Sequence, residues 1–162
     1  MVFVTVGNAK QGFQRILDAI DALTGNGFFG SEQVFIQTGY NTGFQPLHCD
    51  YKAFLPMDEF QQWLEKSDLI ISHGGCTVIS AVRLGKVPVV IPRRKKYGEH
   101  VNDHQVQLVE VLTSEGLVVP AYEAEDLPQA ITETRRRSGH PRPPSPSQML
   151  ALVAQAIEEL IP

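Results

Sequence analysis

The chain has 162 residues, of which 43% are apolar, as expected for one globular domain with a sizeable core. Its formal net charge of −4 excludes the strongly basic composition typical of nucleic-acid-binding proteins. The two cysteines show no metal-ligand spacing with the five histidines, and no apolar run is long enough to cross a membrane. Since no signal segment precedes the first apolar residues, we expect a cytoplasmic protein without a metal centre.

The first part of the chain alternates between strand and helix patterns. Residues 2–6 form a continuous apolar run, which predicts a parallel strand buried on both faces. Apolar residues then recur at helical spacing over residues 10–24, as far as a Gly-Asn-Gly turn. Residues 33–37 predict a second strand, and residues 49–54 predict a shorter third one.

The alternation continues through the middle of the chain. A proline and an acidic first turn predict a short helix over residues 56–66, and residues 69–71 follow as an apolar strand. A glycine-rich turn then leads into a predicted helix over residues 76–84, which Gly85 ends. Residues 88–91 predict the next strand.

Four consecutive cations at residues 93–96 follow this strand, and a helix is predicted over residues 101–112. The last predicted strand covers residues 117–119. A helix from Leu127 ends at three arginines, in agreement with the helix dipole.

We expect three segments along the chain. Residues 1–137 form the α/β domain, and residues 138–147 form a linker because they contain four prolines and a glycine. Residues 148–162 predict a terminal helix with an apolar stripe, which packs on this domain or on a partner.

Repeated strand–helix alternation with short loops predicts a doubly wound parallel sheet in a single Rossmann-like domain. Ligands of such sheets bind at the carboxyl ends of the strands, where the strand order reverses. Gly7 and Asn8 follow the first predicted strand, and residues 73–75 follow the fourth. We therefore expect a binding site between these two turns.

The chemistry of the second turn favours an anionic ligand. Gly74 and Gly75 allow the backbone to approach a ligand closely, and the following helix offers free N–H groups at its positive end. Cys76 and Thr77 lie in its first turn and add a thiol and a hydroxyl. A Gly-Gly turn also occurs in α/β proteins without any ligand, and this one matches neither a Walker loop nor a dinucleotide fingerprint.

Six segments together resemble a known family: FVTVGN (3–8), FIQTG (35–39), YKAFLPMDEF (51–60), DLIISHGG (68–75), AVRLGKVPVVIPR (81–93) and GEHVNDHQ (98–105). They are similar to the donor-binding C-terminal half of GT-B glycosyltransferases of the family 28 type. The resemblance is strongest to the small catalytic subunits of two-component bacterial exopolysaccharide and capsule glycosyltransferases. The chain is also similar to the catalytic subunit of the eukaryotic transferase that adds the second N-acetylglucosamine to dolichyl diphosphate.

The resemblance implies a site for a UDP-sugar, which is a substrate and not a cofactor. Phe54 and Leu55 would lie against the uracil, and Asp103, His104 and Gln105 would reach the hydroxyls of the sugar. The predicted diphosphate contacts are His73, Gly74, Gly75, Cys76, Thr77 and Arg93, and Gly7, Asn8, Ser80 and Asn102 are further predicted donor-binding residues. Two positions depart from the family pattern: the glycine turn is one residue shorter, and Ser80 stands where relatives carry a ribose-binding Glu.

The implied reaction is an inverting, metal-independent transfer of a hexose-type sugar to a lipid-linked acceptor in polysaccharide biosynthesis. His104 is one possible general base, although at a sugar-contacting position it is better suited to donate a hydrogen bond. A single domain supplies only half of a GT-B enzyme. The resemblance therefore implies a membrane-anchored acceptor-binding subunit as partner, which would also supply the catalytic base and hold the chain at the inner face of the membrane.

Alternatives remain at this point. The shorter turn and Ser80 are compatible with a non-catalytic nucleotide-sugar-binding or scaffolding module on the same fold. A nucleotide-sugar epimerase fits less well, because those enzymes need two domains in one chain. The cations at residues 93–96 and 135–137 could face the anionic membrane or the partner, or could be a solvated loop and a helix end.

Overall fold

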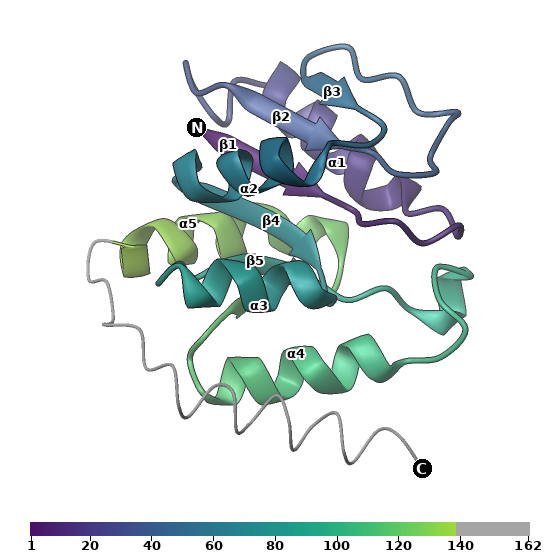
Figure 1. The fold of residues 1–162 in the computed structure, drawn as a ribbon, viewed down its shortest axis with the longest axis vertical. Coiled ribbons are helices and arrows are strands. Elements are labelled where there is room, and N and C mark those ends of the chain that lie inside the picture. Colours follow the sequence, from purple (N-terminus) through teal and green to yellow (C-terminus); the bar gives the residue numbers. More distant parts are fainter. Residues whose placement is uncertain (139–162) are drawn as a thin grey trace.

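In the computed structural model, which describes residues 1–138, a six-stranded parallel sheet lies between two layers of helices (Figure 1). The strand order is β3-β2-β1-β4-β5-β6, so the chain starts in the middle of the sheet and runs outward twice. This topology confirms the predicted doubly wound Rossmann-like fold, with the reversal between β1 and β4. The strands are β1 (Val2–Thr5), β2 (Val34–Gln37), β3 (Asp50–Lys52), β4 (Leu69–His73), β5 (Val89–Ile91) and β6 (Val119–Pro120).

Alternate residues of the strands face opposite layers, because successive side chains of a strand point to opposite faces. Val2 and Val4 pack with the first layer, which contains α1 (Gln14–Gly25) and α5 (Leu127–Ser138). Phe3 packs with the second layer, which contains α2 (Met57–Lys66), α3 (Cys76–Arg83) and α4 (His104–Ser114). Two short 3-10 helices, η1 (Lys95–Tyr97) and η2 (Ala124–Asp126), lie in the loops after β5 and β6.

Two helices begin later than their apolar spacing predicts. Helix α1 begins at Gln14 instead of residue 10, because residues 7–12 form a loop and the N–H of Phe13 binds the Asn41 side chain at 2.7 Å. Helix α4 begins at His104 instead of residue 101, because Asp103 accepts a hydrogen bond from the Lys95 N–H at 2.9 Å. In both cases a contact with a distant loop replaces the first predicted helical turn.

The structure leaves part of the predicted organisation untested. The linker of residues 138–147 and the helix of residues 148–162 lie outside the described residues, apart from Ser138, which ends α5. No helix within residues 1–138 is long and apolar enough to cross a membrane.

Candidate functional site

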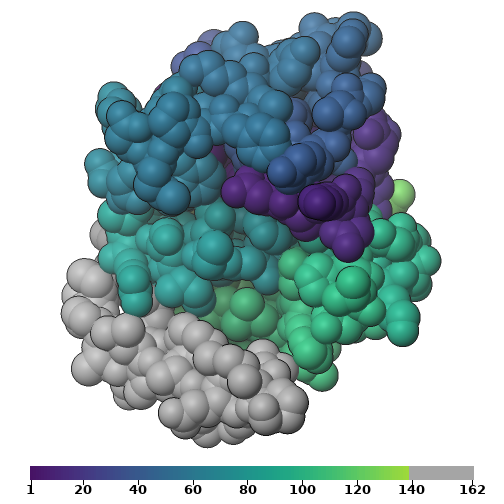
Figure 2. Space-filling view, turned by 45° about the vertical axis from the view of Figure 1, so that its right-hand side comes forward, coloured from purple at the N-terminus to yellow at the C-terminus, as the bar shows by residue number. Residues whose placement is uncertain are grey.

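The loops that follow β1, β2, β4 and β5 meet at the carboxyl edge of the sheet. Figure 2 shows the purple N-terminal part of the chain across the middle of this side of the molecule, between blue segments and green segments. The loops touch through their backbones: a Cβ on Gly39 would lie 2.2 Å from the carbonyl oxygen of Gly7. Both glycines have positive φ angles, which favour glycine over other residues. The loops after β1 and β2 are therefore in direct backbone contact.

The imidazole of His73, at the end of β4, lies between two glycines. A Cβ on Gly7 would be 2.4 Å from Cε1 of His73, and a Cβ on Gly75 would be 2.3 Å from its Nε2. Burial lowers the pKa of His73 to about 4, with the positive charge of Arg93 as a further cause. This lowered pKa makes the imidazole neutral near pH 7, and its Nδ1 is buried without a hydrogen-bond partner.

Helix α3 points its N-terminus at the same place. Gly75 is its N-cap residue, and no side chain among the described residues caps the first turn. The N–H groups of an uncapped helix end and the helix dipole together favour an anion. Cys76 is exposed in this turn, whereas Thr77 is almost completely buried. Ser80 lies one turn further along and is half-buried.

The glycine turn lies directly against the start of α4. A Cβ on Gly74 would be 3.1 Å from both Cβ and the carbonyl oxygen of Gln105, and 3.2 Å from a methyl group of Val109. Only a residue without a side chain fits this contact comfortably. The structure therefore brings together the glycine turn and the polar cluster at residues 102–105, which are far apart in the sequence.

Three members of that polar cluster also shape the loop around them. The amide oxygen of Gln105 accepts a hydrogen bond from the Arg93 N–H at 3.0 Å, which leaves its NH₂ group available as a donor. One carboxylate oxygen of Asp103 accepts from the Lys95 N–H, and Oδ1 of Asn102 accepts from the His104 N–H at 3.3 Å. The His104 side chain is exposed. The cluster thus offers both donors and acceptors to a ligand.

Phe54 and Leu55 lie at the other side of the site, between β3 and α2. Leu55 packs partly into the core, whereas Phe54 is 46% exposed. Its ring makes an edge-to-face contact with Tyr40, with 5.0 Å between the ring centres. The sequence prediction did not include Tyr40, although its position directly after Gly39 at a strand end was a usable signal. The two rings form an exposed aromatic pair.

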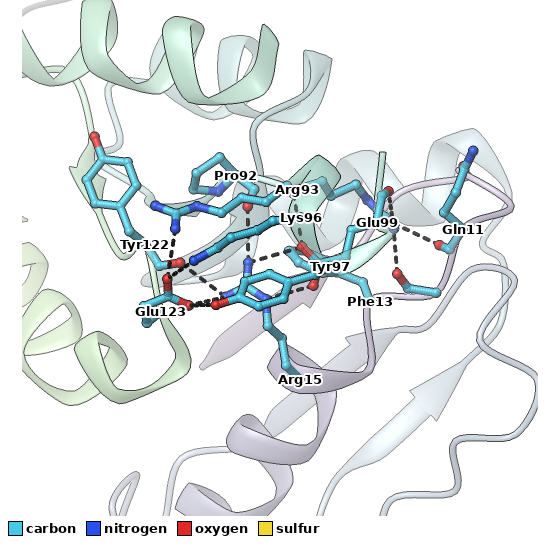
Figure 3. A network of polar contacts seen from close by, with 12 residues as sticks. Gln11, Phe13, Arg15, Pro92, Arg93, Lys96, Tyr97, Glu99, Tyr122 and Glu123 are labelled. Carbon is cyan, nitrogen blue, oxygen red and sulfur yellow. Dashed lines mark hydrogen bonds and ion pairs between the residues drawn. The ribbon is translucent and has the colours of Figure 1, made fainter. Parts of the chain in front are cut away.

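The cationic loop after β5 differs from the prediction. Arg93 is fully buried, and its guanidinium donates hydrogen bonds to backbone carbonyls. The guanidinium of Arg94 and the amine of Lys96 both bind Glu123, at 2.8 Å and 3.0 Å (Figure 3). The predicted direct contact between Arg93 and the diphosphate does not fit this burial, and Arg93 contributes nothing to a cationic surface. The reason is that distant loops supply oxygen partners for these cations.

Two glutamates, Glu99 and Glu123, take part in a network that the sequence prediction missed. Buried Glu99 binds the Arg15 guanidinium at 2.7 Å and the N–H of Arg94 at 3.0 Å. Glu123 also accepts a hydrogen bond from the Tyr97 hydroxyl at 2.9 Å. Among the described residues, no group of three or more His, Cys, Asp or Glu side chains is arranged to hold a metal ion.

Comparison with a family model gives a match over nearly the whole chain. Residues 1–160 match the glycosyltransferase family 28 C-terminal domain. No curated protein matches the chain.

Three solved structures share the fold. The glycosyltransferase SnogD from Streptomyces nogalater has 21% identity and a TM-score of 0.51, and the alignment covers 96% of this chain and 44% of SnogD. The glycosyltransferase of kitacinnamycin has 16% identity and a TM-score of 0.60, with 96% and 38% covered. MurG from Acinetobacter baumannii has 17% identity and a TM-score of 0.51, with 94% and 49% covered. The chain thus spans less than half the length of each of these structures.

Proposed function

The chain belongs to the glycosyltransferase family 28 C-terminal domain family, and from this premise we propose that it binds the UDP-sugar donor of a glycosyl-transfer reaction. The observation that carries the proposal is the contact between Gly74 and Gln105, at 3.1 Å for an added Cβ. Through this contact, the proposed anion site at the glycine turn lies next to the proposed hydroxyl-binding cluster at residues 102–105. Both lie at the carboxyl edge of the sheet, where the strand order reverses. A nucleoside diphosphate sugar likewise carries an anionic diphosphate directly next to the hydroxyl groups of its sugar.

The diphosphate would bind at the N-terminus of α3. The uncapped N–H groups after Gly75 favour negative charge, and the imidazole of His73 lies beside them. The same groups would stabilise the diphosphate as it leaves, without the help of a metal ion. Because the pKa of His73 is about 4, this imidazole is neutral near pH 7 and can take part in a hydrogen bond without carrying charge.

The sugar would bind between Asp103, His104 and Gln105. The Gln105 NH₂ group donates, the second carboxylate oxygen of Asp103 accepts, and the exposed His104 ring can do either. The uracil would lie near Phe54 and Leu55, where exposed aromatic surface is available. We propose a hexose-type donor, as the resemblance of the sequence to glycosyltransferases of this family implies.

We further propose that the acceptor is lipid-linked and that a second, membrane-attached half binds it. The chain spans less than half of each matched glycosyltransferase, which supports a missing half. The reaction would invert the configuration at the anomeric carbon, with an acceptor hydroxyl as nucleophile. The general base would come from the second half, because His104 has a more direct role at the sugar. On this proposal the chain would act at the inner face of the membrane, in polysaccharide biosynthesis.

The change of Gln105 to Glu tests the sugar site. Glu keeps an oxygen for the Arg93 N–H but replaces the donating NH₂ group. We expect the ratio of the dissociation constants of UDP and UDP-hexose to fall about tenfold, the value of one lost hydrogen bond. Calorimetry with UDP, UDP-glucose and UDP-galactose measures this ratio. Free UDP carries more negative charge than a UDP-hexose, so repulsion by the new carboxylate would raise the ratio and cannot account for a fall.

The matched control is Gln107→Glu, which adds the same charge on an exposed position of α4. It should leave the ratio unchanged. If the wild-type chain binds neither UDP nor a UDP-hexose at millimolar concentrations, the proposed function is wrong. If Gln105→Glu and Gln107→Glu give the same ratio, the assignment of Gln105 to the sugar is wrong.

A non-catalytic module is the second candidate, and two observations favour it. Ser80 lacks the carboxylate that would hold a ribose by charge-assisted hydrogen bonds, and the glycine turn is one residue short. Such a module would bind the nucleotide or a partner without sugar transfer.

A further inference from the structure

The buried guanidinium of Arg93 joins two loops of the site. Its Nη2 donates to the carbonyl of Val6 at 2.7 Å, and its Nη1 donates to the carbonyl of Gln11 at 2.8 Å. Nη1 also donates to the carbonyl of Glu99 at 3.2 Å. Figure 3 shows Arg93 with Gln11 of the loop after β1 and Glu99 of the loop after β5. The Arg93 side chain therefore fixes the distance between the loop after β1 and the loop after β5.

The backbone of Arg93 acts on a third part of the site. Its N–H donates to the side-chain oxygen of Gln105, which orients the amide of the proposed sugar-binding residue. The guanidinium carbon lies 4.6 Å from the ring centre of Phe13, the residue that ends the loop after β1. Arg93 thus contacts Val6, which precedes Gly7, and Phe13, which ends the loop after β1. It also contacts Gln105.

We propose that Arg93 is a positioning residue of the donor site: its side chain sets the spacing between the loop at Gly7 and the polar cluster at Gln105, without touching the donor. The effect on a nucleotide rests on the proposed function. The effect on the loop of residues 7–12 does not depend on it.

Among the cations of its loop, Arg93 differs in being fully buried without a carboxylate in direct contact. A buried charge is unfavourable unless hydrogen bonds compensate for it. Here carbonyl groups of the two loops supply that compensation, and the nearby charge of Glu99 supports it. The two loops cannot move apart without leaving this charge unsatisfied.

The shape of arginine explains why lysine would not replace it. The carbonyls of Val6 and Gln11 bind different nitrogens of the planar guanidinium. A lysine has one nitrogen, which can satisfy several carbonyls of one segment. Lys86 does so at the end of α2, where it binds the carbonyls of Leu64, Glu65 and Ser67. The carbonyls of Val6 and Gln11 lie five residues apart in the loop after β1, so in Arg93→Lys this loop loses at least one of its two hydrogen bonds to the side chain.

The test compares Arg93→Lys with the wild-type chain by amide hydrogen exchange and by calorimetry with UDP. In the variant we expect the amides of residues 6–13 to exchange at least tenfold faster. We also expect UDP to bind about tenfold more weakly, measured well below the unfolding temperature. A role limited to stability would not change the UDP affinity of the folded protein.

Two controls separate positioning from stability. Lys86→Met removes another partly buried cation bound to three carbonyls, far from the site, so it should lower stability but leave the UDP affinity unchanged. Lys95→Met removes the exposed cation of the same loop and should change neither property.

A second variant covers the case in which Arg93→Lys does not fold. Asn41 holds the other end of the same loop, because its side chain binds the Phe13 N–H and the Thr38 carbonyl, both at 2.7 Å. Asn41→Ala should therefore produce the same faster exchange and weaker UDP binding.

Wild-type exchange at residues 6–13 in the folded variants, or a UDP affinity within twofold of wild type, would overturn the positioning role alone. Absence of UDP binding by the unsubstituted chain would overturn the proposed function, and the role of Arg93 in donor binding with it.

Discussion

His73 shows how single residues depend on their neighbours at this site. Its ring fits only because Gly7 and Gly75 carry no side chains on either side of it. The positive φ of Gly7 adds a second reason for glycine there. The sequence predicted both glycines as ligand contacts. The structure gives them a further role, since they make room for a histidine that follows a buried strand.

The pH dependence of stability tests the burial of His73. The unfolded chain binds a proton at this histidine below its ordinary pKa of 6.5, whereas the folded chain does so only below about 4. Lowering the pH from 6.5 to 4 therefore favours the unfolded state, by about 3 kcal/mol for this group. In His73→Asn this part of the pH dependence should disappear. Urea unfolding between pH 4 and pH 9 measures it.

Measurements above pH 7.5 serve as the internal control for this substitution. There His73 is neutral in both states, so the difference between variant and wild type should not change with pH. The same slope for both proteins between pH 6.5 and pH 4 would show that His73 is not buried as the structure has it.

Among the elements, the loop after β5 and the C-terminal end of α2 are stabilised by hydrogen bonds to residues from other parts of the chain. The loop carries Arg93 and Arg94, and its oxygen partners come from the loop after β1, from Glu99 and from Glu123. Helix α2 similarly ends at a lysine from another part of the chain: Lys86 binds three carbonyls of residues 64–67 at 2.6–2.7 Å. These carbonyls would otherwise lack partners, as at any helix C-terminus.

Substitution of Lys86 by Met is expected to destabilise the fold at this helix end. Each lost hydrogen bond to a charged group costs about 1.5–3 kcal/mol, although solvent can replace part of it here. We expect a loss of about 2 kcal/mol and a fall in the unfolding temperature of about 4–8 °C. Thermal unfolding followed by circular dichroism measures it.

Lys66→Met is the comparison variant, because Lys66 is an exposed cation in the last turn of the same helix. It should cost less than about 0.5 kcal/mol, as is usual for exposed surface positions. Equal effects of the two substitutions would mean that the Lys86 amine does not stabilise the helix end.

At the scale of the whole molecule, the chain has the fold of a glycosyltransferase family 28 C-terminal domain. It covers 38–49% of the three matched structures. Its carboxyl edge carries the glycine turn, the polar cluster and the exposed pair of Tyr40 and Phe54. The proposed transfer at this edge would need a second surface that brings the acceptor hydroxyl to the sugar.

Reconstitution with an acceptor-binding half decides between the catalytic and the non-catalytic candidate. We expect the chain alone to bind the donor without transferring the sugar, and the pair to transfer radiolabelled hexose from a UDP-hexose to membrane lipid. His104→Ala combined with Gln105→Ala should reduce this transfer at least a hundredfold by removing two contacts to the sugar. The variant pair should still assemble, as size-exclusion chromatography would show.

Gln107→Ala, on an exposed position of the same helix, is the control and should keep full activity. A pair that assembles and binds UDP but transfers no sugar from any UDP-hexose tested would favour the non-catalytic module.

The sequence by itself determined the doubly wound fold, because strand and helix signals are local and their alternation permits few topologies. It also indicated the glycine turn and the cluster at Asp103 and Gln105, whose residue types carry their own chemistry. Only the tertiary structure decided that Gly74 touches Gln105, that Tyr40 joins Phe54, and that Arg93 is buried. The physical reason is that a hydrogen-bond partner or a close backbone contact comes from another loop, and local spacing holds no information about which loop that is.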